Sequence, residues 1–132
     1  MLSRWFRKKE KTLTGAPAVR RQKTYSALSG YVYQYFYDGQ RPSAPEQGTE
    51  YVFDVSADRK TSVHVSVFVS TEAVESWQDE TGRTLSGTER YAIAKMALFQ
   101  AFDERENPEA MREAVYLTPA GVRAILASLN ID

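Results

Sequence analysis

The feature that most constrains the fold is the alternation of side chains between residues 50 and 70, which gives one apolar and one mixed face. A period of two places the alternating side chains on one face of β-strands. Residues 57–61 are polar and few enough to form a hairpin loop. We therefore predict antiparallel strands at about 50–56 and 62–70 with one apolar face. The apolar members of this face are Tyr51, Phe53, Val55, Val63, Val65, Val67 and Val69.

A further strand is predicted over residues 30–37, because aromatic and β-branched side chains suit a pleated sheet. Asp38-Gly39 and the Pro-, Ser- and Gly-rich residues that follow predict a loop over 38–48. If Val32 and Phe36 belong to the core, the outer face of the sheet carries a row of tyrosines. The alternative is that the C-terminal helices or a second subunit cover these rings. The row consists of Tyr31, Tyr33, Tyr35 and Tyr37.

Helix signals follow the strands. Ser70 or Thr71 can cap a short helix over 71–79. Ser86 and Glu89 have the spacing of a capping box, in which each side chain satisfies a backbone N–H of the first turn. The helix that starts there is apolar on nearly all sides between residues 91 and 102, so it must touch more than one layer. We predict that it lies on the valine face.

In the rest of the chain, two residue pairs that end in proline indicate helix starts. Asn107-Pro108 and Thr118-Pro119 each place a capping residue before a proline, which starts a helix. Residues 113–117 are interpreted as a continuation of the helix that Asn107-Pro108 starts or, instead, as a short strand. In the last helix, apolar residues at positions i, i+3, i+4 and i+7 form one buried stripe. These residues are Val122, Ile125, Leu126 and Leu129.

Together these patterns predict an α+β fold, with a small antiparallel sheet of three to four strands packed against a central helix and short C-terminal helices. A chain of 132 residues is the size of one domain. We place a flexible basic tail at 1–23 and a single domain at 24–132. The predicted core is Phe53, Val55, Val63, Val65, Val67, Val69, Ile93, Met96, Leu98, Phe102, Val122, Ile125, Leu126 and Leu129.

The net charge of zero hides a strong asymmetry along the chain. Residues 1–23 hold eight basic side chains and one acid, 8 − 1 = +7, so the remaining residues carry −7. A tail of this kind can bind anionic membranes, nucleic acid phosphates or a partner protein, can dock on its own acidic body, or can stay solvated with no specific task. The tentative binding residues of the tail are Arg4, Trp5, Phe6, Arg7, Lys8, Lys9 and Lys11.

The tyrosine row and His64 complete the candidate binding residues. An exposed aromatic sheet face stacks bases in some RNA-binding domains, but a nucleic acid surface should be basic and this body is acidic. The preferred interpretation is therefore that the C-terminal helices or a second subunit cover the tyrosine face, which makes a homodimer one possibility, with nucleic acid as the alternative.

Catalytic and cofactor signals are weak. A hairpin symmetric about Arg59 places Asp54 opposite His64, with Ser66 two residues further on the same face. Side chains two apart on a strand stand about 6.5–7 Å apart, too far for a Ser–His hydrogen bond. The chain has one histidine, no cysteine and no phosphate-binding glycine loop, so we predict no catalytic residue, no metal site, no cofactor and no small-molecule ligand.

The sequence thus favours a non-enzymatic binding or scaffold protein of otherwise unknown function. The basic tail is expected to contact an anionic membrane surface, and the sheet face a partner or a second subunit. The alternatives are a nucleic-acid-associated protein and a small enzyme that uses Asp54 and His64. No apolar run approaches the ~18 residues of a membrane span, so we expect a cytoplasmic protein that is peripheral at the membrane surface.

Overall fold

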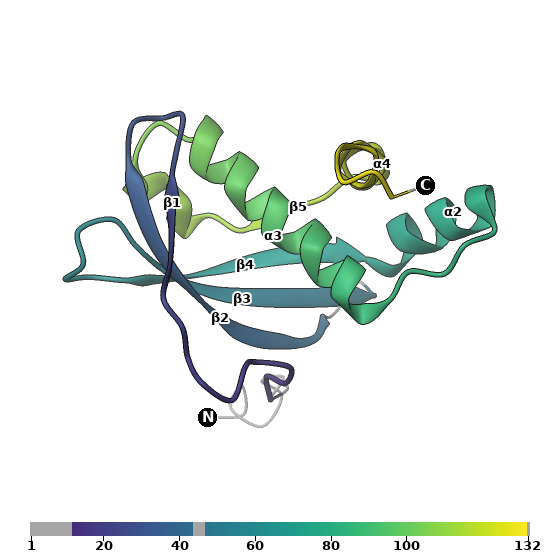
Figure 1. Ribbon diagram of the computed structural model, residues 1–132, viewed down its shortest axis with the longest axis horizontal. Helices are drawn as coiled ribbons and strands as arrows, with labels where there is room; N and C mark the ends of the chain where they lie inside the picture. Colours follow the sequence, from purple (N-terminus) through teal and green to yellow (C-terminus); the bar gives the residue numbers. More distant parts are fainter. Residues whose placement is uncertain (1–11, 44–46, 132) are drawn as a thin grey trace, which may run out of the picture.

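The computed structural model describes residues 12–43 and 47–131, which form an α+β fold (Figure 1). The strands are β1 (Lys23–Ser26), β2 (Val32–Ser43), β3 (Gly48–Ser56), β4 (Val63–Ser70) and β5 (Val115–Tyr116). The helices are α2 (Thr71–Thr81), α3 (Gly87–Glu104) and α4 (Pro119–Ser128), with a short 3-10 helix η1 (Pro108–Arg112).

The described strands form one mixed sheet in the order β1-β2-β3-β4-β5. Strands β1 to β4 pair antiparallel, and β5 pairs parallel with β4. The prediction of three to four antiparallel strands was therefore only roughly right. The strand β1 was missed because Lys23–Ser26 lies in a polar stretch with no alternating pattern, and the alternative of a short strand within 113–117 is confirmed as β5.

Most local predictions of helix starts are confirmed. Ser70 caps α2 by accepting a hydrogen bond from the Ala73 N–H. Ser86 and Glu89 form the capping box of α3. Asn107 and Thr118 cap η1 and α4, with proline in the first turn of each. These signals act within three or four residues of the chain, so the sequence is enough to read them.

The strand β2 continues through Asp38-Gly39, so the prediction of a loop from residue 38 was wrong. The pairing with β3 shifts register between Tyr37 and Gly39, which makes Asp38 the extra residue of a β-bulge. Gly39 has a φ of +119°, and a Cβ there would lie 2.7 Å from the Thr14 carbonyl oxygen. Gly39 therefore allows the β-bulge and the close approach of the N-terminal segment, and it does not begin the predicted loop.

The predicted hairpin register is confirmed, and it decides which face of β2 is buried. Asp54 pairs with His64, and Tyr35 pairs with Val55. Cross-strand partners share a face, so the tyrosines lie on the apolar face of β3. Tyr33 and Tyr35 are 0% and 3% exposed. The interpretation that the tyrosines form the outer face was therefore wrong, and the rings are covered by a helix, although not by the C-terminal helices that the alternative named.

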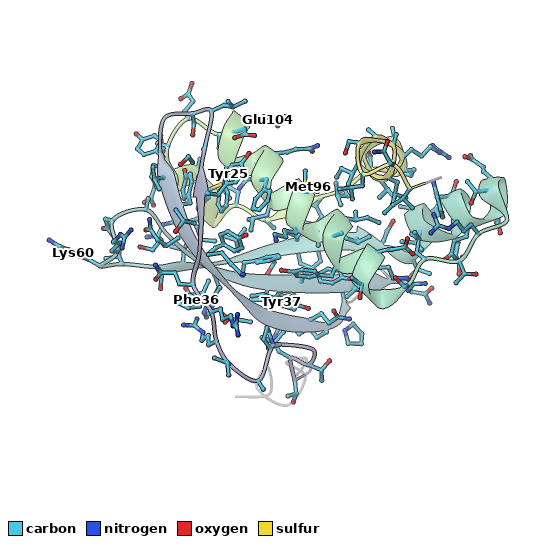
Figure 2. The ribbon with its side chains drawn as sticks, in the orientation of Figure 1. Tyr25, Phe36, Tyr37, Lys60, Met96 and Glu104 are labelled. Atoms are coloured by element: carbon cyan, nitrogen blue, oxygen red, sulfur yellow. The ribbon has the colours of Figure 1, made fainter. Side chains whose placement is uncertain are left out.

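The helix that covers them is α3, not the C-terminal helices. The Tyr33 ring stacks on Phe102 with centroids 4.2 Å apart, and Tyr35 meets Phe99 edge-on at 5.7 Å. Figure 2 labels Phe36 and Tyr37, successive residues of β2 that project to opposite faces of the sheet. The buried residues of α3 also include the small side chains of Ala94, Ala97 and Ala101.

The predicted core is otherwise confirmed, since its members are buried except for three that are partly buried at its border, Val63, Met96 and Leu129. Further buried side chains lie outside the predicted set. These are Tyr33, Gln34, Tyr35, Tyr51, Val52, Val74, Trp77, Leu85 and Met111, together with the alanines Ala73, Ala94, Ala97 and Ala101.

Residues 12–22, which the sequence assigns to the tail, lie against the sheet in this structure. Two backbone hydrogen bonds join Thr14 and Gln40, with N···O distances of 2.9 and 2.8 Å. The segment then leads into β1, which pairs with the start of β2. The body of the protein therefore holds the end of the basic segment in a fixed place.

Replacing Phe102 by alanine tests the aromatic layer. Phe102 is fully buried, so its truncation removes the stack with Tyr33 and leaves a cavity, with an expected loss of about 3–5 kcal/mol in the free energy of unfolding. Urea denaturation measures this loss. The control Leu28→Ala, at a residue 88% exposed, should change stability by less than about 0.5 kcal/mol. Equal effects of the two substitutions would contradict the packing described.

Asp58 should give the hairpin loop a distinct acid dependence. Hydrogen bonds from the backbone N–H groups of Thr61 and Lys60 lower the pKa of its carboxyl from 3.8 to about 2. A depressed carboxyl pKa contributes stability above the unfolded value, and this contribution is lost as pH falls from about 4 through about 2. An NMR titration should place Asp58 near 2, and Asp58→Asn should remove that part of the pH dependence of stability. Titration near 3.8 would contradict the loop geometry.

Candidate functional site

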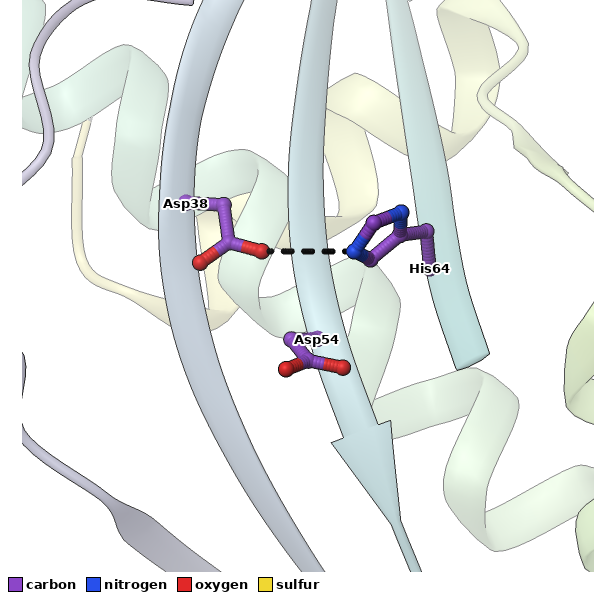
Figure 3. A group of neighbouring side chains, drawn as sticks. All are labelled: Asp38, Asp54 and His64. Atoms are coloured by element: carbon purple, nitrogen blue, oxygen red, sulfur yellow. Dashed lines mark ion pairs between the residues drawn. The ribbon is translucent and has the colours of Figure 1, made fainter. Parts of the chain in front are cut away.

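Three ionisable side chains lie in a row across the outer face of the sheet, the face turned away from α3 (Figure 3). Asp38 comes from the bulge of β2, Asp54 from β3 and His64 from β4. The His64 Nε2 atom lies 3.8 Å from Asp38 Oδ2, so the imidazole reaches across β3. The sequence correctly placed Asp54 opposite His64, but Asp38 is the carboxylate that His64 approaches most closely in the described ion pairs.

A guanidinium from the N-terminal segment joins the two carboxylates. Arg20 Nη2 donates to Asp54 Oδ2 at 2.8 Å and to Asp38 Oδ1 at 3.2 Å. The same guanidinium lies 3.8 Å from the centroid of the Phe36 ring. The hydrogen bond to Asp54 is the largest influence that raises the pKa of Arg20. Two nearby carboxylates and an aromatic face thus form a cradle for one cation, and Arg20 fills it.

A metal ion is the other cation that these groups could hold. One ligand atom each of Asp38, Asp54 and His64 lies within 4.8 Å of the others, a cluster that the sequence did not indicate. A metal there would have to displace Arg20, which already supplies positive charge to both carboxylates. The two carboxylates therefore form ion pairs with Arg20 within the protein, and we assign no metal-dependent chemistry to them.

The possible triad of Ser66, His64 and Asp54 is not assembled. The Ser66 hydroxyl donates to Glu50 Oε2 at 2.5 Å, and Arg41 Nε lies 2.9 Å from the other oxygen of that carboxylate. Burial raises the pKa of Glu50, but the hydrogen bonds from Arg41 and Ser66 outweigh burial and lower it overall. Ser66 is thus a donor to a carboxylate and does not form a nucleophile–base pair with His64.

The remaining predicted site residues have two different outcomes. Tyr33, Tyr35 and Tyr37 pack under α3, where burial raises the pKa of Tyr35 to about 12, so these phenols stay protonated at neutral pH. Tyr31, which directly precedes β2, is 39% exposed. The basic and aromatic tail residues lie outside the described residues. They are Arg4, Trp5, Phe6, Arg7, Lys8, Lys9 and Lys11.

A cavity of about 730 Å³ lies at the far edge of the sheet, where β5 meets the start of α2. Its walls include Phe68, Tyr116, Glu72 and Glu75. Sequence reasoning missed this site because Tyr116 belongs to a two-residue strand about 48 positions from Phe68 (116 − 68 = 48), and only the parallel pairing brings them together. The one feature of the sequence that could have indicated this cavity was Tyr116, an aromatic residue within the short strand predicted at 113–117.

Comparison with known proteins gives no identity. No known family, curated protein or solved structure matches this chain. Among the described residues, none of the helices has both the length and the apolar composition needed to cross a membrane. Any function must therefore be argued from the chain itself.

Arg20→Gln tests whether the cation cradle holds the N-terminal segment. The substitution leaves Asp38 and Asp54 close together without their shared cation, and the exposure of Arg20 limits the expected loss to about 1 kcal/mol of unfolding free energy. Urea denaturation at low and high salt measures it, and the loss should shrink as salt screens the repulsion.

Arg21→Gln is the matched control, because it removes the same charge from the neighbouring exposed residue. Stability should be unchanged in this variant. If Arg20→Gln and Arg21→Gln behave alike at low salt, the cradle contributes nothing to attachment of the segment.

Proposed function

We propose that the protein is a non-enzymatic binding protein that attaches to an anionic membrane surface through residues 1–11 and offers the outer face of its sheet to a partner. The observation that carries the proposal is the attachment of residues 12–22 by Thr14 and Arg20. This attachment fixes where the basic segment leaves the domain, so binding through residues 1–11 would turn one edge of the sheet toward the membrane.

The composition of residues 1–11 suits a membrane interface. Five basic side chains surround Trp5 and Phe6. Aromatic rings enter the headgroup boundary, and each Lys or Arg near an anionic surface contributes about 1 kcal/mol. Anionic lipids are concentrated on the cytoplasmic leaflet, so the compartment we propose is the cytoplasm, with the protein peripheral at the membrane.

The outer sheet face supports the partner half of the proposal. Its side chains include the exposed His64 and Tyr116 and the partly exposed Phe36 and Phe68. Aromatic residues with a polar surround are typical of surfaces that bind proteins. We therefore propose this outer face as the partner-binding surface and no longer the tyrosine row, because α3 covers the tyrosine rings.

Vesicle co-sedimentation tests the membrane half. The full chain should pellet with phosphatidylcholine vesicles that contain phosphatidylserine, and not with phosphatidylcholine alone. The triple substitution Lys8→Gln, Lys9→Gln and Lys11→Gln removes three charges, so affinity should fall by about 3 kcal/mol, on the order of 100-fold. High salt should have the same effect.

The control variant carries Arg21→Gln and Lys60→Gln, which remove positive charge outside residues 1–11. Its vesicle binding should stay near that of the unmodified chain. Equal pelleting of the triple variant and the unmodified chain would remove the membrane proposal, and salt-sensitive binding to nucleic acid alone would favour the nucleic acid alternative.

A further inference from the structure

The cavity beside β5 has an aromatic wall and an acidic wall. Phe68 and Tyr116 stack with ring centroids 5.0 Å apart and planes 9° apart. Tyr116 is 68% exposed, so one face of the stacked pair is open. Across the cavity of about 730 Å³, the first turns of α2 supply Glu72 and Glu75.

The two glutamates are exposed and form no ion pair within the part of the chain that the structure describes. The described lining of the cavity contains no basic residue. The amino end of a helix attracts anions, but the Ser70 side chain caps this one, and the charges of Glu72 and Glu75 outweigh the partial charge of the helix end. A ligand that fits is therefore a cation with an aromatic group beside it.

We propose that this cavity is the docking site of the chain's own residues 1–11. These residues carry five basic side chains and one acid, 5 − 1 = +4, and they place Trp5 and Phe6 among the positive charges. Charge and aromatic content thus complement Glu72, Glu75 and the Phe68–Tyr116 pair. Docking places the basic side chains against the glutamates and an aromatic ring against Tyr116.

The segment can reach the cavity. Its attachment point lies where Thr14 bonds to Gln40, and Ser43, three residues further along β2, lines the cavity. Three residues of strand span about 10 Å, whereas eleven extended residues span up to about 36–39 Å. A tether of this length keeps the segment at an effective concentration on the order of millimolar, so weak contacts are enough for docking within one molecule.

This inference does not depend on membrane binding, but it would regulate it. A docked segment cannot place Trp5 and its neighbouring charges in a membrane. The vesicle and the cavity therefore compete for the same residues. Removing the negative charge of the cavity should release the segment and strengthen pelleting with anionic vesicles.

Acrylamide quenching of tryptophan fluorescence in the full chain tests the docking. The chain has two tryptophans, and Trp77 is buried, so quenching reports Trp5. A Trp5→Phe variant gives the background of Trp77. We expect Trp5 to be protected at low salt, and the double variant Glu72→Gln, Glu75→Gln to raise its quenching constant severalfold. Tyr116→Ala should act in the same direction.

The matched control is Asp79→Asn with Glu104→Gln, which removes two exposed acidic charges outside the cavity lining. Protection of Trp5 should persist in it. Circular dichroism should show that all variants remain folded, as expected for substitutions at exposed positions.

Two results would overturn the proposal. If Trp5 is as accessible in the unmodified chain as in the Glu72→Gln, Glu75→Gln variant, the cavity does not hold the segment. If protection grows with protein concentration and sedimentation shows a dimer, the occupant is the segment of a second copy. Protected Trp5 together with no vesicle pelleting in any variant would support docking and overturn only the proposed membrane function.

Discussion

The packing of α3 on the aromatic face of the sheet is the interaction on which the rest of the structure depends. Phe102 and Phe99 of the helix pack on the rings of Tyr33 and Tyr35, which are buried in the core. The carboxylate of Asp103, near the end of α3, accepts hydrogen bonds from the Tyr25 hydroxyl and the Leu28 N–H, so the helix also holds the hairpin of β1 and β2. One helix thus fixes both the core and the sheet edge from which the N-terminal segment arrives.

Burying one face of the sheet under α3 leaves the charged and polar side chains on the other. The alternation of β3 and β4 brings Asp54 and His64 to that outer face, and the bulge adds Asp38. Two carboxylates at this spacing repel unless a cation lies between them. Arg20 provides the cation, so attachment of residues 12–22 follows from the same alternation that forms the core.

The sequence predicted what depends on short-range signals. Helix caps and the hairpin register act within a few residues, and those predictions were confirmed. The buried face of β2 was not predictable in this way, because Val32 and Phe36 are as suited to a core as Tyr33 and Tyr35. Pairing with β3 makes the choice. The candidate site was predicted only at Asp54 and His64, since Arg20 lies 34 positions from Asp54 and the register shift that produces the bulge at Asp38 is set by pairing with β3.

The charge asymmetry of the chain therefore has a structural meaning. Residues 12–22, the end of the basic segment, are held on the sheet partly by the solvent-exposed ion pairs of Arg20. Each ion pair of this type contributes about 0.2–1 kcal/mol to stability. A membrane offers about 1 kcal/mol for each basic side chain, a comparable amount. If both proposals hold, neither attraction dominates, and residues 1–11 would exchange between an acidic site on the body and an anionic surface outside it. A stronger acidic site on the body would hold residues 1–11 permanently, whereas a neutral body would offer these residues no competing binding site.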